Sequence, residues 1–453
     1  MNIYILTEIT KRELDSNLLL ACKAANNGFD VFISNHGTFK LLNDKKILKE
    51  GIFHTKSLVH GYNKKKLHES LKKNNIKISS IDEEAGLVFK DLNIFSKARF
   101  TEDDLKVADI IFCWGDDDFK TLSSLFNNSK GKLLLSGSPR FDMMRQEFND
   151  YWSSSKHQSK QITISGNFNL VNGYIHRSKI ITELEKQGYF LRSEKYKDYL
   201  VDTIDDTEKK FNEFLRMIEI IIQKFPNEQF LLRPHPLEKI ETWQNQFSNY
   251  ENVIISKEGN INEQLINTKL LIHNSCTSAF HAYFYNVPIL SYEPIDCKTN
   301  YGQIANELSE RTKNINDLIE LMSTIINKKY KITNYDIKKN LFNNKVFTQN
   351  KIHSSEIIVK EWSKISRFSE ENKIDLKKVK IELLREKIIT KLKRFTLKII
   401  KPFKNLYSDK KFEDLDEIEI SKKINKIRNI LSFESEILVK KISDKCFFIK
   451  KKD

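Results

Sequence analysis

Short apolar runs alternate with amphipathic stretches along the first 350 residues, and this alternation constrains the fold more than any other feature. In the first part of the chain, runs rich in β-branched residues predict strands at 3–9, 30–34, 77–81, 109–114 and 132–136. Helical spacing between these runs is clearest over 12–26, which ends before Gly28. Strands that alternate with helices predict a parallel sheet covered by helices on both faces.

The same alternation starts again near Gln161. Strands are predicted at 161–165, 229–233, 252–256, 269–273 and 287–292. Helices are predicted at 206–225, 238–247, 277–285 and 315–327. A chain of 453 residues is too long for one ordinary core. We therefore expect an α/β fold with two Rossmann-like domains facing a cleft, at 1–160 and 161–350, and a crossover helix at 351–370 that returns to the first domain.

From about residue 371 the sequence becomes strongly basic. Residues 371–453 hold +10 of the formal net charge of +15, and Lys-rich amphipathic stretches follow one another. We expect a basic helical appendage there that joins neither sheet. Within it, 391–407 predicts either an interfacial helix on anionic lipid or a helix packed on the second domain, and Pro402 favours the second. The charge would permit nucleic-acid binding, but no recognised motif supports it, and we expect no nucleic-acid partner.

Cysteine usage and the lack of long apolar runs exclude several protein classes. The five cysteines are widely spaced and form no Cys-x-x-Cys pair, which argues against a zinc ribbon or a disulfide framework. Residues 1–10 lack the basic start of a signal peptide, and no run approaches 18 apolar residues. We expect a cytoplasmic protein with reduced thiols, and no metal site is predicted.

Polar residues follow nearly every predicted strand. In open parallel sheets, ligands bind outside the carboxyl ends of the strands. In the first half these positions include Arg12, Glu13, Glu83, Glu84 and Arg140. In the second half they include Asn167, Asn169, Arg233, His235 and the stretch 274–278. So many polar loops on one side of the predicted sheets indicate a binding cleft.

Two stretches of the second half suit a phosphate group. Arg233 and His235 alternate with two prolines, so both side chains project from a rigid turn, and an arginine beside a protonatable histidine suits a phosphate dianion. A strand-ending turn with a surface histidine explains this stretch equally well when it is taken alone. About 40 residues later, the hydroxyls of Ser275, Thr277 and Ser278 open a predicted helix.

The amino-terminal end of that helix favours an anion, because its first N–H groups lack partners and the helix dipole is positive there. The same hydroxyls also suit plain helix capping, which is compatible with anion binding. Together with the turn at Arg233 and His235, they predict a phosphate clamp. The pair is more specific than either stretch.

Carboxylates of the first half are the candidates for acid–base chemistry. Asp82, Glu83 and Glu84 are consecutive, so they cannot all face one ligand, and crowding of like charges raises the pKa of at least one of them. Such a group suits a general base or a nucleophile, whereas the plain interpretation is a solvated acidic turn. Glu13 lies in the first turn of a predicted helix, where the dipole stabilises a carboxylate without any function.

Several of these motifs together resemble a known family. Residues 12–20, 82–88, 137–142 and 167–172 are similar in order and spacing to motifs of bacterial surface carbohydrate (capsule or O-antigen) biosynthesis proteins, over roughly residues 1–350. At 137–139 this chain has Gly-Ser-Pro, where Gly-Asn-Pro is commoner. The second-half pair also resembles the His-Pro and Ser/Thr motifs of sialyl and Kdo transferases, which use CMP-sugars, and of teichoic-acid glycerophosphotransferases, which use CDP-glycerol.

The resemblance implies the GT-B fold and a glycosyltransferase that moves a sugar from a CMP- or CDP-linked donor onto a surface polysaccharide or a lipid-linked glycan. The nucleotide-sugar is then a substrate, and no cofactor is expected. The implied donor and phosphate site comprises Arg233, His235, Asn274, Ser275, Thr277 and Ser278. The implied base or nucleophile is Glu84, Glu83 or Glu13. Residues on the acceptor side or in the cleft are Arg12, Arg140, Asn167 and Asn169.

Two rival functions fit the same fold. A nucleotide-sugar 2-epimerase is built on the same two lobes, but it typically has Gly-Gly after the serine, where this chain has Cys276 and Thr277. The other rival is a non-catalytic, nucleotide-binding scaffold in polysaccharide assembly. The polar loops retained in both halves weigh against that role.

Overall fold

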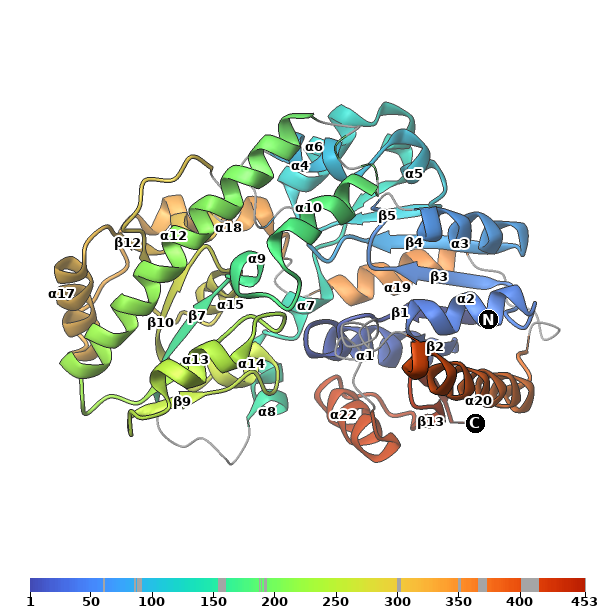
Figure 1. Cartoon of the computed structure of the whole chain (residues 1–453). Helices are drawn as coiled ribbons and strands as arrows, with labels where there is room; N and C mark the ends of the chain where they lie inside the picture. Colours follow the sequence, from blue (N-terminus) through green and yellow to red (C-terminus); the bar gives the residue numbers. More distant parts are fainter. Residues whose placement is uncertain are drawn as a thin grey trace. The chain divides into compact units, whose positions relative to one another are not determined.

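The computed structural model describes residues 1–59, 62–84, 87, 92–153, 160–186, 188, 190, 194–299, 303–348, 352–365, 373–400 and 415–452. The chain divides into two compact units. The first unit contains Met1–Glu83, Phe100–Tyr151 and Val346–Asp453, and the second contains Glu84–Arg99 and Trp152–Lys345. Each unit has its own sheet of mostly parallel strands with helices packed on it (Figure 1), which confirms the predicted α/β class with two Rossmann-like domains.

In the described part of the first unit, eight strands form one sheet in the order β13-β14-β2-β1-β3-β4-β5-β6. They are β1 (Asn2–Leu6), β2 (Asp30–Ser34), β3 (Gly51–Thr55), β4 (Ile76–Ile81), β5 (Ile110–Cys113), β6 (Leu133–Leu135), β13 (Ile437–Ser443) and β14 (Cys446–Lys451). Strands β1 to β6 are parallel. The chain runs from β1 to β2 on one side and then continues with β3 on the other side of β1. In open α/β sheets ligands bind at such a reversal of strand order.

Helices cover both faces of this sheet. On one face, α2 (His36–Asp44), α3 (Tyr62–Lys73) and α20 (Leu376–Ile400) pack on the side chains of Tyr4 and Phe53. The opposite face carries α1 (Thr10–Asn26), α7 (Pro139–Asp142), α19 (Ser354–Ile365) and α22 (Glu417–Ile430). The remaining helices of the unit are α5 (Glu102–Lys106), α6 (Asp116–Leu125), η1 (Asn127–Lys132), η2 (Gln146–Phe148) and α8 (Asn149–Trp152), which reaches the boundary between the units.

Strand β3 was not among the predicted strands. Its sequence, GIFHT, contains a histidine in the middle of the sheet. His54 is fully buried, and burial lowers its pKa to about 3, so the ring is neutral. Its Nδ1 forms a hydrogen bond with Ser79 Oγ at 2.8 Å, and its ring lies 5.1 Å from that of Trp362 in α19. The histidine is therefore a satisfied core residue, and its polarity hides the strand in the sequence.

The prediction that residues 371–453 form a helical appendage outside both sheets is wrong. Strands β13 and β14 form a hairpin, and β14 pairs antiparallel with β2. Phe448 lies opposite Phe32, with the two ring centroids 5.0 Å apart. Without the hairpin, β2 would expose an unpaired edge with an apolar sequence, which favours association with other chains. The buried run at 446–449 covers that edge, while lysines of the hairpin remain at the surface.

The motif at 137–142 fixes the return of the chain into the first unit. Gly137 has φ +77°, and a Cβ atom there would lie 2.3 Å from the carbonyl oxygen of Phe347. Asp142 is buried and accepts hydrogen bonds from the amides of Ser354 (2.8 Å) and Ser355 (2.7 Å). A carboxylate from α7 thus caps the first turn of α19, more than 200 residues later in the chain.

In the described part of the second unit, six parallel strands form a sheet in the order β12-β11-β10-β7-β8-β9. They are β7 (Gln161–Gly166), β8 (Phe230–Arg233), β9 (Val253–Ile255), β10 (Thr268–Asn274), β11 (Ile289–Tyr292) and β12 (Glu310–Thr312), the last of which was not predicted. Strands β8 and β9 follow β7 on one side, and β10 lies on its other side. The strand order therefore reverses between β7 and β10.

The helices of the second unit are α4 (Leu92–Arg99), α9 (Asn169–Asn172), α10 (Arg177–Lys186), α12 (Glu194–Lys224), α13 (Ile240–Phe247), α14 (Ile261–Leu265), α15 (Ser278–Phe284), α16 (Gln303–Glu307), α17 (Ile315–Ile326) and α18 (Tyr335–Lys345). Apolar side chains of α12, α13 and α17 pack on β7, β8 and β10 and form the core on one face. Helix α12 begins 12 residues before its predicted start. None of the helices in the described part of the chain has the length and apolar character needed to cross a membrane.

Candidate functional site

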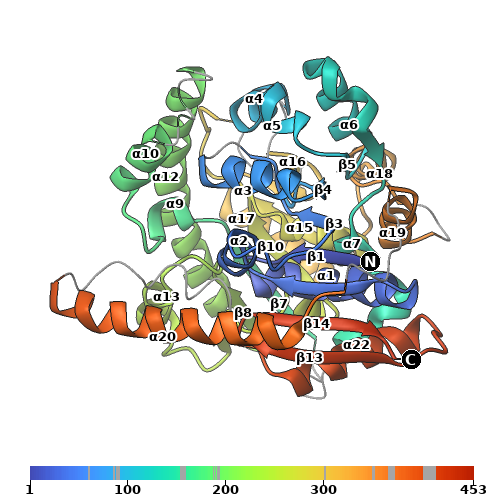
Figure 2. The same ribbon diagram turned by 90° about the vertical axis from the view of Figure 1, so that its right-hand side faces the viewer.

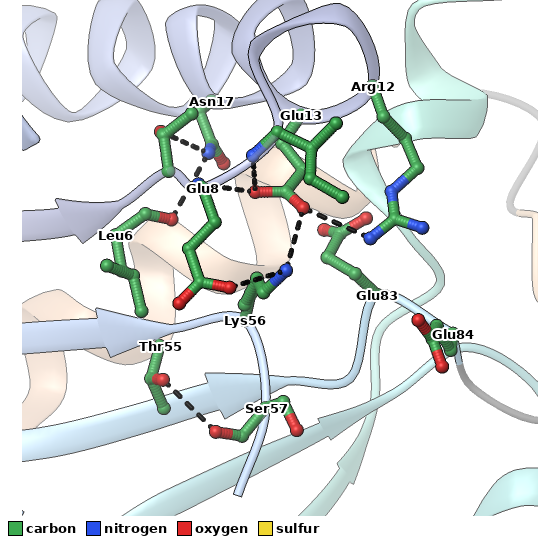
Figure 3. A network of polar contacts seen from close by, with 12 residues as sticks. Leu6, Glu8, Arg12, Glu13, Asn17, Thr55, Lys56, Ser57, Glu83 and Glu84 are labelled. Atoms are coloured by element: carbon green, nitrogen blue, oxygen red, sulfur yellow. Dashed lines mark hydrogen bonds and ion pairs between the residues drawn. The ribbon is translucent and has the colours of Figure 1, made fainter. Parts of the chain in front are cut away.

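A cluster of charged side chains lies at the carboxyl edge of the first sheet, where its strand order reverses (Figure 3). Glu13 belongs to the first turn of α1, which follows β1. Lys56 follows the last residue of β3, and Glu83 lies two residues after the end of β4. The loops after three neighbouring strands therefore bring two glutamates and a lysine together. The sequence analysis predicted this position for the two glutamates, because the loops at the carboxyl ends of parallel strands lie at one edge of the sheet.

Both carboxylate oxygens of Glu13 accept hydrogen bonds within this cluster. One carboxylate oxygen accepts from the backbone amides of Glu8 (2.8 Å) and Ile9 (3.2 Å). The other accepts from Arg12 and Lys56, each at 3.1 Å. Burial acts to raise the pKa of Glu13, but Lys56, Arg12 and the two amides outweigh it and lower the pKa below its ordinary value. Glu13 is therefore a stable carboxylate that anchors the start of α1.

Lys56 bridges two acids. Its ammonium lies 2.9 Å from Glu8 and 3.1 Å from Glu13, and its side chain is mostly buried. Burial alone would lower the pKa of Lys56, but the charges of Glu13 and Glu8 raise it above its usual value. The lysine is thus a permanent cation at this edge of the sheet. The sequence analysis did not single it out, because it follows a strand that was not predicted.

Glu83 lies in a different environment from Glu13. It is 7% exposed, and burial raises the pKa of its carboxyl group above the ordinary value, an effect that Arg140 opposes and Glu13 reinforces. The Arg140 guanidinium lies 3.6 Å from Glu83 Oε2 and donates to the Glu83 carbonyl at 3.2 Å. Among the described residues, no hydrogen bond reaches Glu83 Oε2. This combination suits a group that takes up and releases a proton.

The side chains of Glu84 and Glu83 lie in different environments, as expected for consecutive residues. Its side chain is about half exposed and pairs with Arg99 of α4 at 3.0 Å. Its contacts assign it to the second unit, whereas Glu83 belongs to the first. Of the three carboxylates that the sequence analysis offered as base or nucleophile, Glu83 alone combines burial with a raised pKa. Arg12 and Arg140 lie with the Glu13 and Glu83 cluster.

The second unit has polar loops at its own reversal of strand order, between β7 and β10. The hydroxyls of Ser165, in β7, and Ser278, at the start of α15, are 2.7 Å apart and join the two strand ends. A Cβ atom at Gly166 would lie 2.2 Å from the Phe168 ring, so glycine is needed where β7 ends. Asn167 and Asn169 follow in this loop, half-buried, and Asn169 begins α9.

The stretch between β10 and α15 is tightly fixed. Ser275 adopts φ +53°, and its amide donates to Asn306 Oδ1 at 2.9 Å. Its hydroxyl donates to Asn274 Oδ1 at 2.9 Å, while the Asn274 amide nitrogen donates to the Tyr292 carbonyl at 2.6 Å. The neighbouring amide of Cys276 donates to His273 Nδ1 at 3.3 Å. These contacts hold the loop in a conformation that a residue other than glycine rarely adopts.

Hydroxyl capping of α15, which the sequence suggested, does not occur. Thr277 is the residue before the first turn, but its side chain forms no capping hydrogen bond. No acceptor in the described part of the chain bonds the amides of Thr277 or Ser278. The hydroxyl of Thr277 and these two amides are therefore available to a ligand at the carboxyl edge of the sheet.

A buried lysine lies beside this loop. Lys210, in α12, is 9% exposed, and its ammonium is 3.5 Å from Ser275 Oγ. Its charge also acts on Cys297, where burial raises the pKa of the thiol and Lys210 opposes that effect. No ion pair joins Lys210 to a carboxylate among the described residues. A buried cation without a carboxylate partner suits an anionic ligand. The sequence contained no signal for it, because it lies in mid-helix.

Arg233, predicted as part of the phosphate clamp, is hydrogen-bonded to a neighbouring loop. Its guanidinium donates to the carbonyls of Glu258 (2.8 Å) and Gly259 (2.7 Å). Burial lowers the pKa of Arg233 to about 10, and the nearby charge of Glu263 acts against this shift. The arginine is therefore used to hold the loop between β9 and α14. Cys276 of the Ser275 loop also acts on the pKa of Arg233, so the guanidinium lies near that loop, and its place in the clamp stays a prediction.

His235 keeps a half-buried position in the turn after β8. Its Nδ1 accepts from the Leu237 amide at 3.2 Å, so the neutral ring carries its hydrogen on Nε2 and can donate from there. The turn is held by Glu238, which is fully buried. Glu238 accepts from the amides of His235 (3.1 Å) and Phe168 (3.0 Å) and from the Trp243 indole (3.1 Å). Glu238 thus ties the loop after β8 to the loop after β7.

The two halves of the expected clamp share one edge but are not immediate neighbours. His235 follows β8 and Ser275 follows β10, and β7 lies between these strands. Two strand spacings correspond to about 10 Å. A ligand that reaches both must therefore pass over the loop after β7, with Asn167 and Asn169 beneath it. In the described part of the chain, no three His, Cys, Asp or Glu side chains are grouped so as to hold a metal ion.

Comparison with known proteins shows similarity in fold. No family model matches the chain, and no curated protein matches its sequence. A variant of the wall teichoic acid polymerase TagF has a TM-score of 0.51 at 12% identity, over 80% of this chain and 88% of that chain. UDP-GlcNAc 2-epimerase from Methanocaldococcus jannaschii has a TM-score of 0.46 at 14% identity, over 80% and 100%. A glycosyltransferase from Rickettsia africae has a TM-score of 0.41 at 10% identity, over 81% and 99%. The similarity to TagF confirms the GT-B type of fold.

Proposed function

We propose that the protein is a glycosyltransferase that moves a sugar from a CMP- or CDP-linked donor onto a surface polysaccharide or a lipid-linked glycan. The observation that carries the proposal is the pairing of Lys210 with the Ser275 loop at the switch point of the second sheet. A buried ammonium beside hydroxyls and unbonded amides suits the phosphate of a nucleotide. The similarity in fold to TagF supports it, and another TagF structure, with a TM-score of 0.50, is of a variant soaked with CDPG.

The donor site of this proposal lies in the second unit. Lys210 and the loop of Asn274, Ser275, Thr277 and Ser278 bind the donor phosphate, and His235 donates from Nε2 to the same nucleotide. When the bond between sugar and phosphate breaks, negative charge grows on the phosphate oxygen. A fixed cation in a buried setting stabilises that charge more than water does. Arg233 supports this site indirectly by holding the loop between β9 and α14.

The acceptor site lies in the first unit, where Glu83 is the general base. Glu83 Oε2 takes the proton of the acceptor hydroxyl, the freed oxygen attacks the anomeric carbon, and the nucleotide leaves with the bonding electrons. Glu13 and Lys56 position this group and stay charged throughout. Arg12 and Arg140 bind the acceptor, with Asn167 and Asn169 along the path of the donor. In this proposal the first unit binds the acceptor and the second unit binds the donor.

The test is a donor screen on the purified chain. CMP-, CDP-, UDP- and GDP-sugars are supplied with and without glycan acceptors, and released nucleotide and extended glycan are measured by chromatography. We expect turnover with a cytidine-linked donor. His235→Ala and Lys210→Met should each lower turnover at least about 100-fold, because each removes a donor aimed at the leaving group. Lys210→Arg should restore part of it.

Matched controls lie close by in the chain. Lys209 is exposed on the same helix as Lys210, and His176 is exposed ahead of α10, so Lys209→Met and His176→Ala should leave turnover unchanged. Conversion of a UDP-sugar to its 2-epimer without net nucleotide release would replace the transferase by an epimerase. Nucleotide binding without turnover of any donor would indicate a scaffold. Normal turnover by His235→Ala would overturn the assignment of that residue.

A further inference from the structure

Helix α20 carries an exposed apolar face that the packing of the first unit does not use. Five large aliphatic side chains between Ile381 and Leu392 are each 43% to 64% exposed: Ile381, Leu384, Ile388, Ile389 and Leu392. At 100° per residue they fall within one stripe along the helix. The stripe is about 16 Å long, from a rise of 1.5 Å per residue.

The opposite face of α20 attaches the helix to the unit. Val379 is fully buried and Leu383 is nearly so, and both pack in the core formed by β1, β2, β3, α2 and α3. Figure 2 shows α20 running alongside β13, which carries Ile442 of the same core. One apolar face therefore explains why α20 packs on the sheet. The other face requires a second explanation, because exposed aliphatic patches of this kind mark interaction surfaces.

The residues that flank the exposed face are mostly cations. Residues 376–392 contain six lysines and arginines against Glu382 and Glu386. Lys377, Lys380, Arg385 and Lys391 are exposed on the same side of the helix as the aliphatic residues or directly beside them. Both acids lie toward one flank. A basic rim around an apolar stripe is complementary to a surface that is negative outside and apolar beneath.

A second copy of the chain fits this face less well. A helix pair needs apolar residues that repeat every 3.5 residues, which would place Ile381, Leu384, Ile388 and residue 391 in the seam. Residue 391 is a lysine. Pairing would also bring two equally basic surfaces together, which costs electrostatic energy. An acidic phospholipid layer meets neither difficulty, because it supplies the opposite charge and accepts aliphatic side chains at any spacing.

We propose that the face of α20 formed by residues 377–392 docks the protein on anionic phospholipid. The aliphatic side chains enter the boundary between headgroups and acyl chains, and the lysines contact the headgroup phosphates. This surface shares only residues 391 and 392 with the segment that the sequence suggested at 391–407. Of that segment, the side chains from residue 393 to 400 and all of 401–407 lie outside the described residues. The inference is independent of the proposed transfer reaction, but it would bring the enzyme to a lipid-linked acceptor.

Vesicle binding of the full chain tests the proposal. Flotation is measured with phosphatidylcholine vesicles and with vesicles that contain one quarter phosphatidylglycerol, at low and at high salt. The triple variant Ile381→Ser, Leu384→Ser, Ile388→Ser removes the apolar stripe and spares Val379 and Leu383. The wild-type chain should bind the anionic vesicles selectively, and high salt should weaken binding. The triple variant should bind at least about tenfold more weakly, since each buried aliphatic group adds to the affinity.

Two controls make the result decisive. Ile337→Ser removes an even more exposed aliphatic side chain from α18 in the second unit and should leave vesicle binding unchanged. Amide exchange of β14 and α2 in the triple variant should match the wild-type chain, which shows that α20 remains packed. The proposal is overturned if the wild-type chain ignores anionic vesicles, or if the triple variant binds them equally well. A wild-type dimer that the triple variant converts to a monomer, without vesicle binding, would assign the face to self-association instead.

Discussion

Glu83 and Glu13 are both glutamates of one cluster, yet their surroundings shift the pKa values of their carboxyl groups in opposite directions. Glu13 receives four hydrogen bonds and salt-bridge contacts, whereas Glu83 has burial and one arginine at 3.6 Å. Carboxyl groups whose pKa values are pushed apart mark a division of roles, because one stays charged while the other can exchange a proton. Under the proposed function, proton transfer therefore belongs to Glu83 and positioning to Glu13.

Glu83→Gln tests this division directly. The amide keeps the size of the side chain but cannot take a proton, so turnover should fall about 10²–10⁴-fold. A carboxyl group with a raised pKa in the folded state makes a contribution to stability that decreases as pH rises. Removing it should therefore leave the free energy of unfolding unchanged or higher at neutral pH, and more so at pH 8 than at pH 5. Chemical denaturation of the first unit at the two pH values measures this, with exposed Glu69→Gln as the matched control.

The same assignment fixes the pH dependence of turnover. A general base must be ionised, so kcat/KM should rise with pH through the pKa of Glu83, which lies above the ordinary value of 4.5. Arg140 opposes this raised pKa, so Arg140→Gln should shift the acidic limb to higher pH. An acidic limb of the kcat/KM profile that stays in place in Arg140→Gln would contradict the role of Glu83.

Glu13 affects stability in the opposite sense from Glu83. Its lowered pKa stabilises the fold at neutral pH, and this contribution is lost in acid.

At the scale of elements, the structure explains why the buried carboxylate of Asp142 is needed. Asp142 in α7 caps α19, and α19 in turn places Trp362 against His54, with its indole donating to Ser79 Oγ at 2.9 Å. The return of the chain to the first unit thus depends on a buried carboxylate in the motif at 137–142. The resemblance placed this motif among functional ones. Its Arg140 lies with Glu83 in the candidate site, whereas the contacts of Asp142 hold the fold together.

Asp142→Asn should loosen α19. An asparagine has one acceptor oxygen and cannot serve both backbone amides, so a buried N–H loses its partner. The cost is roughly 1–3 kcal/mol for a lost cap and an unsatisfied donor. Amide exchange in α19 should accelerate, while exchange in β7 and β10 of the second unit stays unchanged. Asp150→Asn, at an exposed residue of α8, serves as the control. Unaltered protection of α19 would show that its packing, and not the cap, holds it in place.

At the scale of the whole molecule, the first unit is assembled from three separate segments of the chain. Its last segment, from Val346 onward, supplies α19, two more long helices and the hairpin that covers β2. The second unit is nearly continuous, from Trp152 to Lys345 with one short segment added. The first unit therefore cannot complete its core until the carboxyl-terminal hundred residues have been made.

A chain that ends at residue 372 should show this dependence. It retains the second unit and α19 but lacks α20, α22 and the hairpin. Amide exchange in β2 should rise sharply, because its edge loses β14, and the protein should become prone to aggregate. Exchange in β7 and β10 should stay near that of the full chain. A milder variant, Phe448→Ala, should destabilise the first unit by about 3–5 kcal/mol. Full protection of β2 in the shortened chain would refute this account.

The sequence by itself determined the fold class and most of the parallel strands of both sheets. Nine of the ten predicted strands, all but the first, match the observed bounds within two residues, since hydrophobic periodicity is a local property that short stretches carry on their own. It also pointed to the strand-end loops, because in parallel sheets these lie at one edge whatever the details of packing.

Only the tertiary structure decided the points that depend on distant parts of the chain. It gave Glu83 and Glu13 opposite pKa shifts, because a pKa depends on burial and on charges from other elements. It turned Arg233 toward a loop and brought Lys210 from mid-helix to the Ser275 loop. It also paired β14 with β2, more than 400 residues apart, which no local pattern encodes.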